Sequence, residues 1–166
     1  MLKISKNLKD FLDRRGKKYL DVPNPNYEEL YYYANCDELD GILSASSIGE
    51  LTDTLIYLNL NPLKSGTMTY IPSYFMCLSS EPELEIPEGV KAIYPEAFYH
   101  SEIEKVVIPR SIEQINGEAF KHCDQLTQVI YLGTKEEWLN TEIRDDAFTD
   151  CSKLEKIETL DGFIYL

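Results

Sequence analysis

The hydrophobic residues in the C-terminal two thirds of the chain recur at a regular spacing. Residues 84–98 and 106–120 share one pattern, in which an Ile-Pro pair, two further apolar positions and an Ala-Phe pair lie 22 residues apart. A third Ala-Phe pair ends at Phe148, 28 residues after Phe120. This repetition indicates successive coils that stack and bury their apolar sides against one another.

A fainter copy precedes these repeats. Residues 71–77 match residues 94–100 at a shift of 23, which aligns Phe75 with Phe98. The last repeat is longer because additional residues fall near 133–139. We therefore predict about four coils. In all four a large apolar residue stands five positions before the Phe, namely Tyr70, Ile93, Ile115 and Ile143.

Periods of about 20–29 residues are typical of leucine-rich-repeat solenoids. Their strand pattern, L-x-x-L-x-L, is clear at residues 103–108 and 126–131 and looser at 154–159. Alternate residues of a strand face opposite ways, so Val106 should point into the solenoid and Val107 outward.

The repeats resemble the BspA-type leucine-rich repeats, whose coil reads I-P-x-x-V-x-x-I-x-x-x-A-F-x-x-C-x-x-L-x-x-V. The resemblance covers about residues 70–166 and departs from the pattern at Tyr74, where the family has Ala. It implies a solenoid without catalytic residues, in a family whose members are often surface-exposed adhesion or interaction proteins. The match is clearest at Ile108, Pro109, Ile112, Ile115, Ala119, Phe120, Cys123, Leu126 and Val129.

The N-terminal residues follow a helical pattern. Apolar residues at Ile4, Leu8 and Phe11 predict a short amphipathic helix that ends at Gly16. Asn26, with Glu three residues later, is typical of a capping box, which opens a second helix. This second helix should run through residue 34.

Residues 37–60 allow two interpretations. Leu51, Leu55 and Leu58 suit a helix, whereas Ile56, Leu58 and Leu60 suit a degenerate repeat strand. The end of a solenoid exposes its apolar ladder and needs a cover. We therefore predict an α/β repeat protein, with a helical N-terminal cap at residues 1–50 and a leucine-rich-repeat solenoid at residues 51–166. The alternative is a separate functional domain at the N-terminus.

Charge is abundant and unevenly placed. The chain has 16 Lys and Arg against 29 Asp and Glu, a formal net charge of −13. Seven of the basic residues and two of the acidic ones lie in residues 1–18, so this segment carries +5 and the other 148 residues carry −18. Such an acidic body disfavours direct binding to nucleic acid or an anionic membrane, because phosphate binding requires clustered cations. The acidic excess serves solubility or attracts a basic partner surface.

The expected compartment is intracellular. Charges interrupt the apolar residues at the N-terminus every few positions, unlike a secretory signal, and no stretch suits a membrane span. The four cysteines include no C-x-x-C pair, and a chain of this length does not need disulfides to fold. We expect a cytoplasmic protein with free thiols.

Candidate chemistry is sparse. The sequence has no nucleophile elbow, no glycine-rich phosphate loop and no H-E-x-x-H motif, so we predict a protein that is not an enzyme and has no cofactor. The position two residues after each Phe has metal-ligand types, but a solvated bend explains them more simply. This column holds Cys77, His100, His122 and Asp150.

The neighbouring column, three residues after each Phe, fits the buried rung of small residues in the family pattern. In this position a cysteine acts as a small hydrophobic side chain. The column holds Leu78, Ser101, Cys123 and Cys151.

Two outward rows on the repeat strands form the best candidate for a binding surface. Val107 and Ile130 should lie side by side with acidic and polar neighbours, an arrangement typical of protein–protein contact surfaces. Three consecutive tyrosines on a helix must send at least one ring to solvent, and we expect Tyr31 and Tyr32 to assist binding. The other predicted contact residues are Glu85, Lys105, Gln128 and Glu158.

We therefore predict a non-enzymatic module that binds a protein partner through the outward face of the repeat sheet. An alternative hypothesis is a phage or mobile-element inhibitor, for example an anti-CRISPR protein. Its acidic surface would occupy a basic nucleic-acid-binding groove of a host defence protein.

Overall fold

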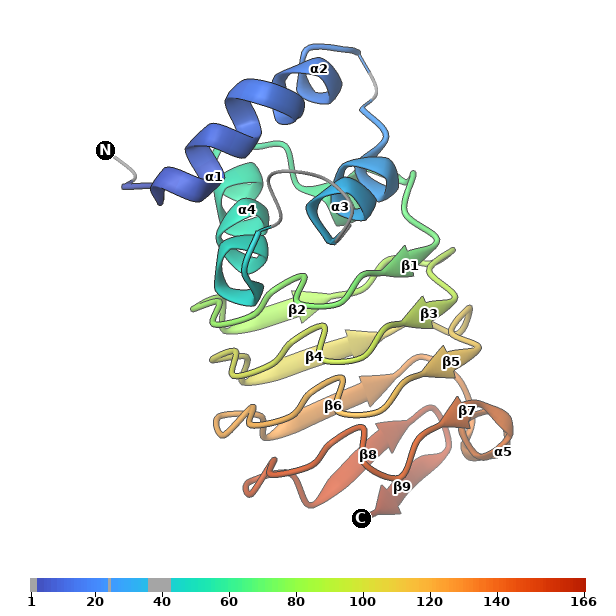
Figure 1. Cartoon of the computed structure of the whole chain (residues 1–166). Helices are drawn as coiled ribbons and strands as arrows, with labels where there is room; N and C mark the ends of the chain where they lie inside the picture. The colour runs from blue at the N-terminus through green and yellow to red at the C-terminus, as the bar shows by residue number, and fades with distance from the viewer. Residues whose placement is uncertain (1–2, 24, 36–42) are drawn as a thin grey trace.

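A computed structural model describes residues 3–23, 25–35 and 43–166. Helices lie at the N-terminal end of the molecule, and a stack of strand-containing coils follows them down to the C-terminus (Figure 1). Within the described residues, no helix has both the length and the apolar character needed to cross a bilayer.

The first helical segment is longer than predicted. Helix α1 (Lys6–Phe11) continues through a π-helical turn (Leu12–Gly16) into α2 (Lys17–Leu20). Gly16 does not end the helix: its backbone is helical, with φ at −59°, and it is buried. A Cβ atom there would lie 2.5 Å from the Leu12 side chain, so Gly16 allows close packing and does not act as a stop.

The second predicted helix is confirmed. Helix α3 (Tyr27–Asn35) begins after Asn26, whose side chain accepts a hydrogen bond from the Glu29 amide at 3.1 Å. Residues 36–42 lie outside the described part of the chain. Beyond them the helical interpretation is correct for α4 (Ala45–Tyr57), which begins at the Ser44 cap. Helix α4 runs across residue 50, so the predicted division into two units at that position stays a prediction.

The repeats form two sheets. Each coil contributes one strand to a four-stranded parallel sheet and one to a five-stranded sheet, with a parallel register in every pair except the last. A 3₁₀ turn (Pro62–Ser65) leads into the first coil, and α5 (Lys135–Asn140) contains most of the predicted insertion. The four-stranded sheet has β1 (Tyr70–Ile71), β3 (Ala92–Ile93), β5 (Gln114–Ile115) and β7 (Glu142–Ile143). The five-stranded sheet has β2 (Glu83–Glu85), β4 (Lys105–Ile108), β6 (Gln128–Tyr131), β8 (Lys156–Thr159) and antiparallel β9 (Gly162–Tyr165).

The core is a set of side-chain columns along the stack. The Phe98 and Phe120 rings stack with centroids 4.7 Å apart, and Phe120 and Phe148 follow at 5.0 Å. Val106 is buried and Val107 half-buried on the opposite face, as the period of two predicts. Each coil thus covers the apolar side of the preceding coil, as predicted from the repeat.

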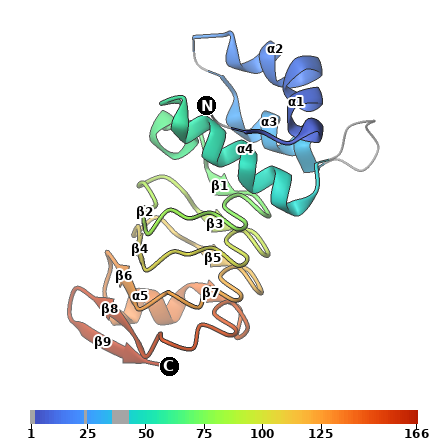
Figure 2. The same cartoon turned by 90° about the vertical axis from the view of Figure 1, so that its left-hand side faces the viewer.

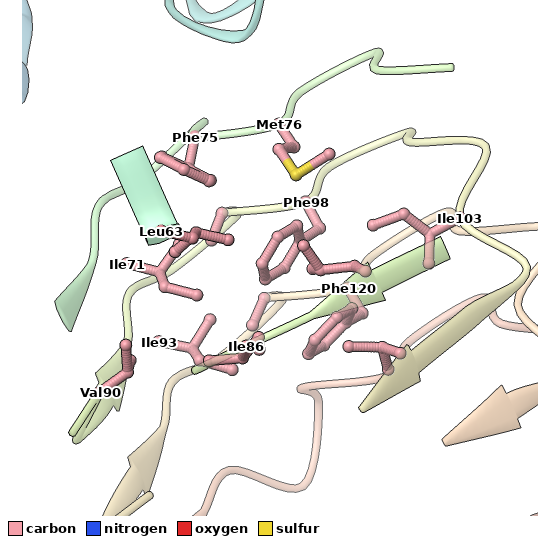
Figure 3. Packing of buried hydrophobic residues seen from close by; sticks show 14 of the residues in the cluster. Leu63, Ile71, Phe75, Met76, Ile86, Val90, Ile93, Phe98, Ile103 and Phe120 are labelled. Atoms are coloured by element: carbon pink, nitrogen blue, oxygen red, sulfur yellow. The ribbon is translucent and has the colours of Figure 1, made fainter. Parts of the chain in front are cut away.

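The first coil differs from the alignment by one residue. Ile71 pairs with Ile93, a shift of 22 and not 23. The Met76 amide donates to the Ala97 carbonyl at 2.9 Å. In the next coil the Phe98 amide makes the equivalent bond, so Met76 occupies the Phe column (Figure 3). Pairing Phe75 with Phe98 would shift the first strand by one residue and turn Ile71 away from the core. The strand pairing therefore determines the register of the first coil, and the match between the two Phe residues does not.

Tyr31 is a core residue and not a contact residue, which corrects the prediction for this side chain. Its ring is fully buried, and the centroid of the ring lies 5.1 Å from that of the Phe75 ring. Its hydroxyl forms a hydrogen bond with the Thr52 hydroxyl. Burial strongly raises the pKa of the Tyr31 hydroxyl. Tyr32 is 62% exposed, as expected for at least one of three consecutive helical tyrosines. Tyr31 faces inward because the first coil offers α3 an apolar surface that only the folded chain creates.

We predict that Phe120→Ala lowers the free energy of unfolding by about 3–5 kcal/mol, since it opens a cavity between two rings. Phe148→Ala should cost less than half as much, because Phe148 is partly exposed and has a stacking partner on one side only. Urea unfolding followed by the fluorescence of Trp138, the single tryptophan, measures both. Equal losses would contradict the continuous column.

We also predict opposite outcomes for two neighbouring tyrosines. Tyr31→Ala should destabilise the protein by about 3–5 kcal/mol, and Tyr31→Phe by about 1 kcal/mol through the lost hydrogen bond. Tyr32→Ala, the matched control, should change stability by less than about 0.5 kcal/mol. The same unfolding assay applies. A large loss for Tyr32→Ala would show that the assignment of faces on α3 is wrong.

Candidate functional site

The candidate site is the exposed face of the five-stranded sheet, which we call the sheet face. Its first row follows from the printed register: Glu85 pairs with Val107, Val107 with Ile130, and Ile130 with Glu158. The strands that carry this row lie one below another along the stack (Figure 2). Val107 and Ile130 are half-buried and form the apolar centre of the row. The structure therefore brings the four predicted residues of this row together.

The second row is polar. Glu83 pairs with Lys105, and Lys105 with Gln128. The Lys105 ammonium lies 3.8 Å from the Glu83 carboxylate, and the Gln128 amide donates to Glu158 at 3.4 Å. Such exposed contacts contribute little to stability, so these groups remain available to a ligand.

Two aromatic residues outside the predicted contact set extend both rows. Strand β9 pairs antiparallel with β8, which places Phe163 opposite Glu158 and Tyr165 opposite Lys156. The Lys156 ammonium lies 4.1 Å from the centroid of the Phe163 ring, a cation–π contact. The signal was present, because an Asp-Gly turn followed by alternating aromatic residues is typical of a hairpin.

A groove of about 390 Å³ lies at the other end of the sheet face. One wall comes from α4 and the 3₁₀ turn, and the other from β2 and β4. Glu81, Glu83 and Glu85 bring three carboxylates to this groove. The other lining residues are Ile56, Asn61, Leu63, Lys64, Met76, Leu84, Lys105 and Val107. No sequence pattern pointed to Ile56, Asn61 or Lys64, because they meet the sheet only through the packing of the helices on the first coil.

Tyr32 remains exposed on α3, an element that does not line this groove. Its predicted part in partner binding stays a prediction.

The column of potential metal ligands is different from the predicted one. The register shift in the first coil puts Leu78, and not Cys77, next to His100: the Leu78 amide donates to the Tyr99 carbonyl at 3.1 Å. The His100 and His122 rings stack at 4.5 Å, and His122 Nδ1 lies 3.3 Å from an Asp150 carboxylate oxygen. Among the described residues, no group of three His, Cys, Asp or Glu side chains is arranged to hold a metal ion.

The buried rung of small residues shifts in the same way. It begins with Ser79 and not with the exposed Leu78, and it continues through Ser101, Cys123 and Cys151. The Cys123 thiol donates to the Phe98 carbonyl at 3.1 Å, and the Cys151 thiol to the Phe120 carbonyl at 3.0 Å. Each of these two thiols therefore ties its coil to the one before it.

Burial and neighbouring groups shift the pKa of all three described thiols. Cys77, Cys123 and Cys151 are free and buried, while Cys36 lies outside the described residues. Burial raises the pKa of the Cys77 thiol to about 11, and the neighbouring Cys123 together with burial raises the pKa of Cys151. The neighbouring Cys151 in turn lowers the pKa of the Cys123 thiol. The raised pKa keeps the Cys77 and Cys151 thiols protonated at neutral pH, which removes the nucleophilic thiolate at these two positions.

No curated protein matches the chain. A solved structure, described as a leucine-rich cell surface protein from Faecalibacterium prausnitzii A2-165, is 32% identical and has a TM-score of 0.43. The match covers 46% of this chain and 21% of that protein, so the chain spans about a fifth of that protein's length.

The family comparison covers the whole repeat region. The sequence profile of the BspA type leucine-rich repeat region matches residues 51–166 in six copies. Repeat families of this kind are typically non-enzymatic and mediate protein interactions. The match, the repeated coils and the parallel strands show that this chain belongs to the BspA-type leucine-rich-repeat family.

Proposed function

We propose that the protein is a non-enzymatic module that binds a protein partner through the sheet face. The observation that carries this proposal is the alignment of Val107 and Ile130, two half-buried β-branched residues on neighbouring strands, within a polar rim. Solvent-exposed apolar side chains that cluster inside a polar rim are typical of protein contacts. The family's general role in protein interactions supports the same conclusion.

The rigidity of the sheet favours binding. A hydrogen-bonded strand ladder on one side and stacked rings beneath it hold Val107 and Ile130 in place before the partner arrives. Preorganised groups lose little conformational entropy on association, so more of the interaction energy appears as affinity.

Charge indicates the chemistry of the partner. Glu83, Glu85 and Glu158 lie on the sheet face, and the whole chain carries −13. A partner surface with Lys or Arg would complement these carboxylates and associate faster through long-range attraction. We therefore propose a partner with a basic surface.

The alternative of a phage-borne inhibitor receives no support from the family or from the solved neighbour. It is not part of the proposal. The intracellular location and the lack of direct contact with nucleic acid stay predictions.

The first test is the double variant Val107→Glu/Ile130→Glu. Two charges at the apolar centre should weaken partner binding at least tenfold, because the partner would bury them and residues at the centre of an interface dominate its binding energy. The measurement is affinity capture from the native host, quantified by mass spectrometry against the wild-type chain. Leu139→Glu and Leu160→Glu serve as controls, since both are exposed apolar residues outside the sheet face. The capture should name a partner that the double variant loses and the controls retain. Equal recovery with the double variant would refute the proposed face.

The second test concerns salt. If carboxylates on the sheet face attract a basic partner, the dissociation constant of the captured partner should rise at least tenfold between about 50 and 300 mM salt, because counterions screen exposed charges. The variant Glu83→Gln/Glu85→Gln should show a smaller rise. Isothermal titration calorimetry at both salt concentrations measures the effect. A salt-independent affinity would remove the basic partner from the proposal.

A further inference from the structure

Strand β2 is the edge of the five-stranded sheet that faces the N-terminal helices (Figure 1). Its backbone bonds with β4 through alternate residues: the Ile86 amide donates to the Val107 carbonyl at 3.0 Å, and the Lys105 amide to the Pro82 carbonyl at 3.1 Å. In a parallel ladder the intervening residues direct their amide and carbonyl groups to the opposite side. Glu83 and Glu85 therefore present these groups away from β4.

The groove of about 390 Å³ lies between β2 and the wall formed by α4 and the 3₁₀ turn, and it also reaches Lys105 and Val107 on β4. Glu81, Glu83, Leu84 and Glu85 all line it, so it runs along β2. No described strand pairs with β2 on that side. Unpaired groups at a strand edge are a template for another strand.

We propose that β2 accepts an extended segment of the protein partner as an added strand. The inference rests on the proposed function, and it names how the partner uses one end of the sheet face. Main-chain hydrogen bonds supply affinity in this mode, and the alternate side chains supply specificity.

The walls of the groove specify the side chains of this segment. Side chains of the added strand that share the exposed face with Glu83 and Glu85 meet two carboxylates two residues apart, and Glu81 adds a third. Only Glu83 among these three has an ion pair within the described residues, the contact with Lys105 at 3.8 Å. Lys and Arg at alternate positions complement this charge.

The alternate side chains of the added strand, which point to the opposite face, meet an apolar wall. Ile56, Leu63 and Met76 line the groove on the side of the helices and the first coil. Lys64 is the one further cation among the lining residues besides Lys105, so carboxylates remain in excess. The partner segment should therefore alternate basic and apolar residues.

A second copy of this chain fits less well. In a dimer the added strand would be β9, the other edge strand of the sheet. At alternate positions β9 has Phe163 and Tyr165, whereas the carboxylates of the groove favour basic side chains there. Charge thus favours a basic segment from a different protein.

The probe for this proposal is a seven-residue peptide of alternating lysine and valine, blocked at both ends. Two further peptides carry N-methyl groups on the lysine amides or on the valine amides. Only one of these two sets can face β2 in an added strand, so one methylated peptide should bind at least tenfold more weakly and the other like the parent. A peptide with glutamate in place of lysine controls for charge. Fluorescence anisotropy with the full chain measures all four.

Hydrogen exchange by NMR supplies a second readout. The Glu83 and Glu85 amides should exchange at least tenfold more slowly when the parent peptide is bound. The Lys105 amide, already bonded to the Pro82 carbonyl, should not change. Glu83→Gln/Glu85→Gln should weaken the parent peptide at least fivefold, whereas Glu102→Gln, an exposed glutamate outside the groove, should not.

The outcomes separate this inference from the proposed function. The added strand is overturned if the parent peptide does not bind at about 1 mM, if both methylated peptides bind like the parent, or if no amide of β2 gains protection. In each case loss of partner capture by Val107→Glu/Ile130→Glu would leave the proposed function standing. If that double variant captures the partner normally while the peptide binds as expected, partner binding through Val107 and Ile130 is refuted. Strand addition at the edge of β2 is then still supported.

Discussion

The parallel strand ladder is the interaction on which the remaining structure depends. Each coil is too small to bury its apolar side, so its stability comes from the coil before it and the coil after it. The register of the ladder sets which side chains meet across coils. Phe120 lies between Phe98 and Phe148 because the backbone bonds of three coils place the rings about 5 Å apart. The same register places Val107 beside Ile130 on the opposite face, so one constraint builds both the core and the surface.

The two ends of the stack are covered by different elements. At the N-terminal end, Tyr31 and the helices pack on the first coil and leave a groove next to the edge of β2. At the C-terminal end, an antiparallel strand completes the five-stranded sheet and adds two aromatic residues to the sheet face. The acidic groove and the aromatic end lie at opposite ends of one continuous surface. A long partner surface could therefore use charge at one end and aromatic contacts at the other.

Much of the sheet face was predictable, for a simple reason. Spacing along the chain specifies the register when coils are regular, and the period of two then assigns each residue to a face. Glu85, Val107, Ile130 and Glu158 were aligned correctly by these two rules alone. In the first coil the match between Phe75 and Phe98 predicts a register that differs by one residue from the observed strand pairing. The same shift moves Cys77 out of the column of potential metal ligands.

The pattern of the amino acids was sufficient to establish the family, the stacked coils and the two rows of the sheet face, because these features repeat and depend on nearest neighbours only. The buried position of Tyr31, the continuation of the first helix past Gly16 and the groove beside β2 could not be read in this way. Each arises where the irregular N-terminal helices meet the first coil, and contacts between segments far apart in the chain determine them. Residues on a helix with several possible inward faces turn toward whichever surface the folded chain offers, and that surface exists only after the coils have stacked.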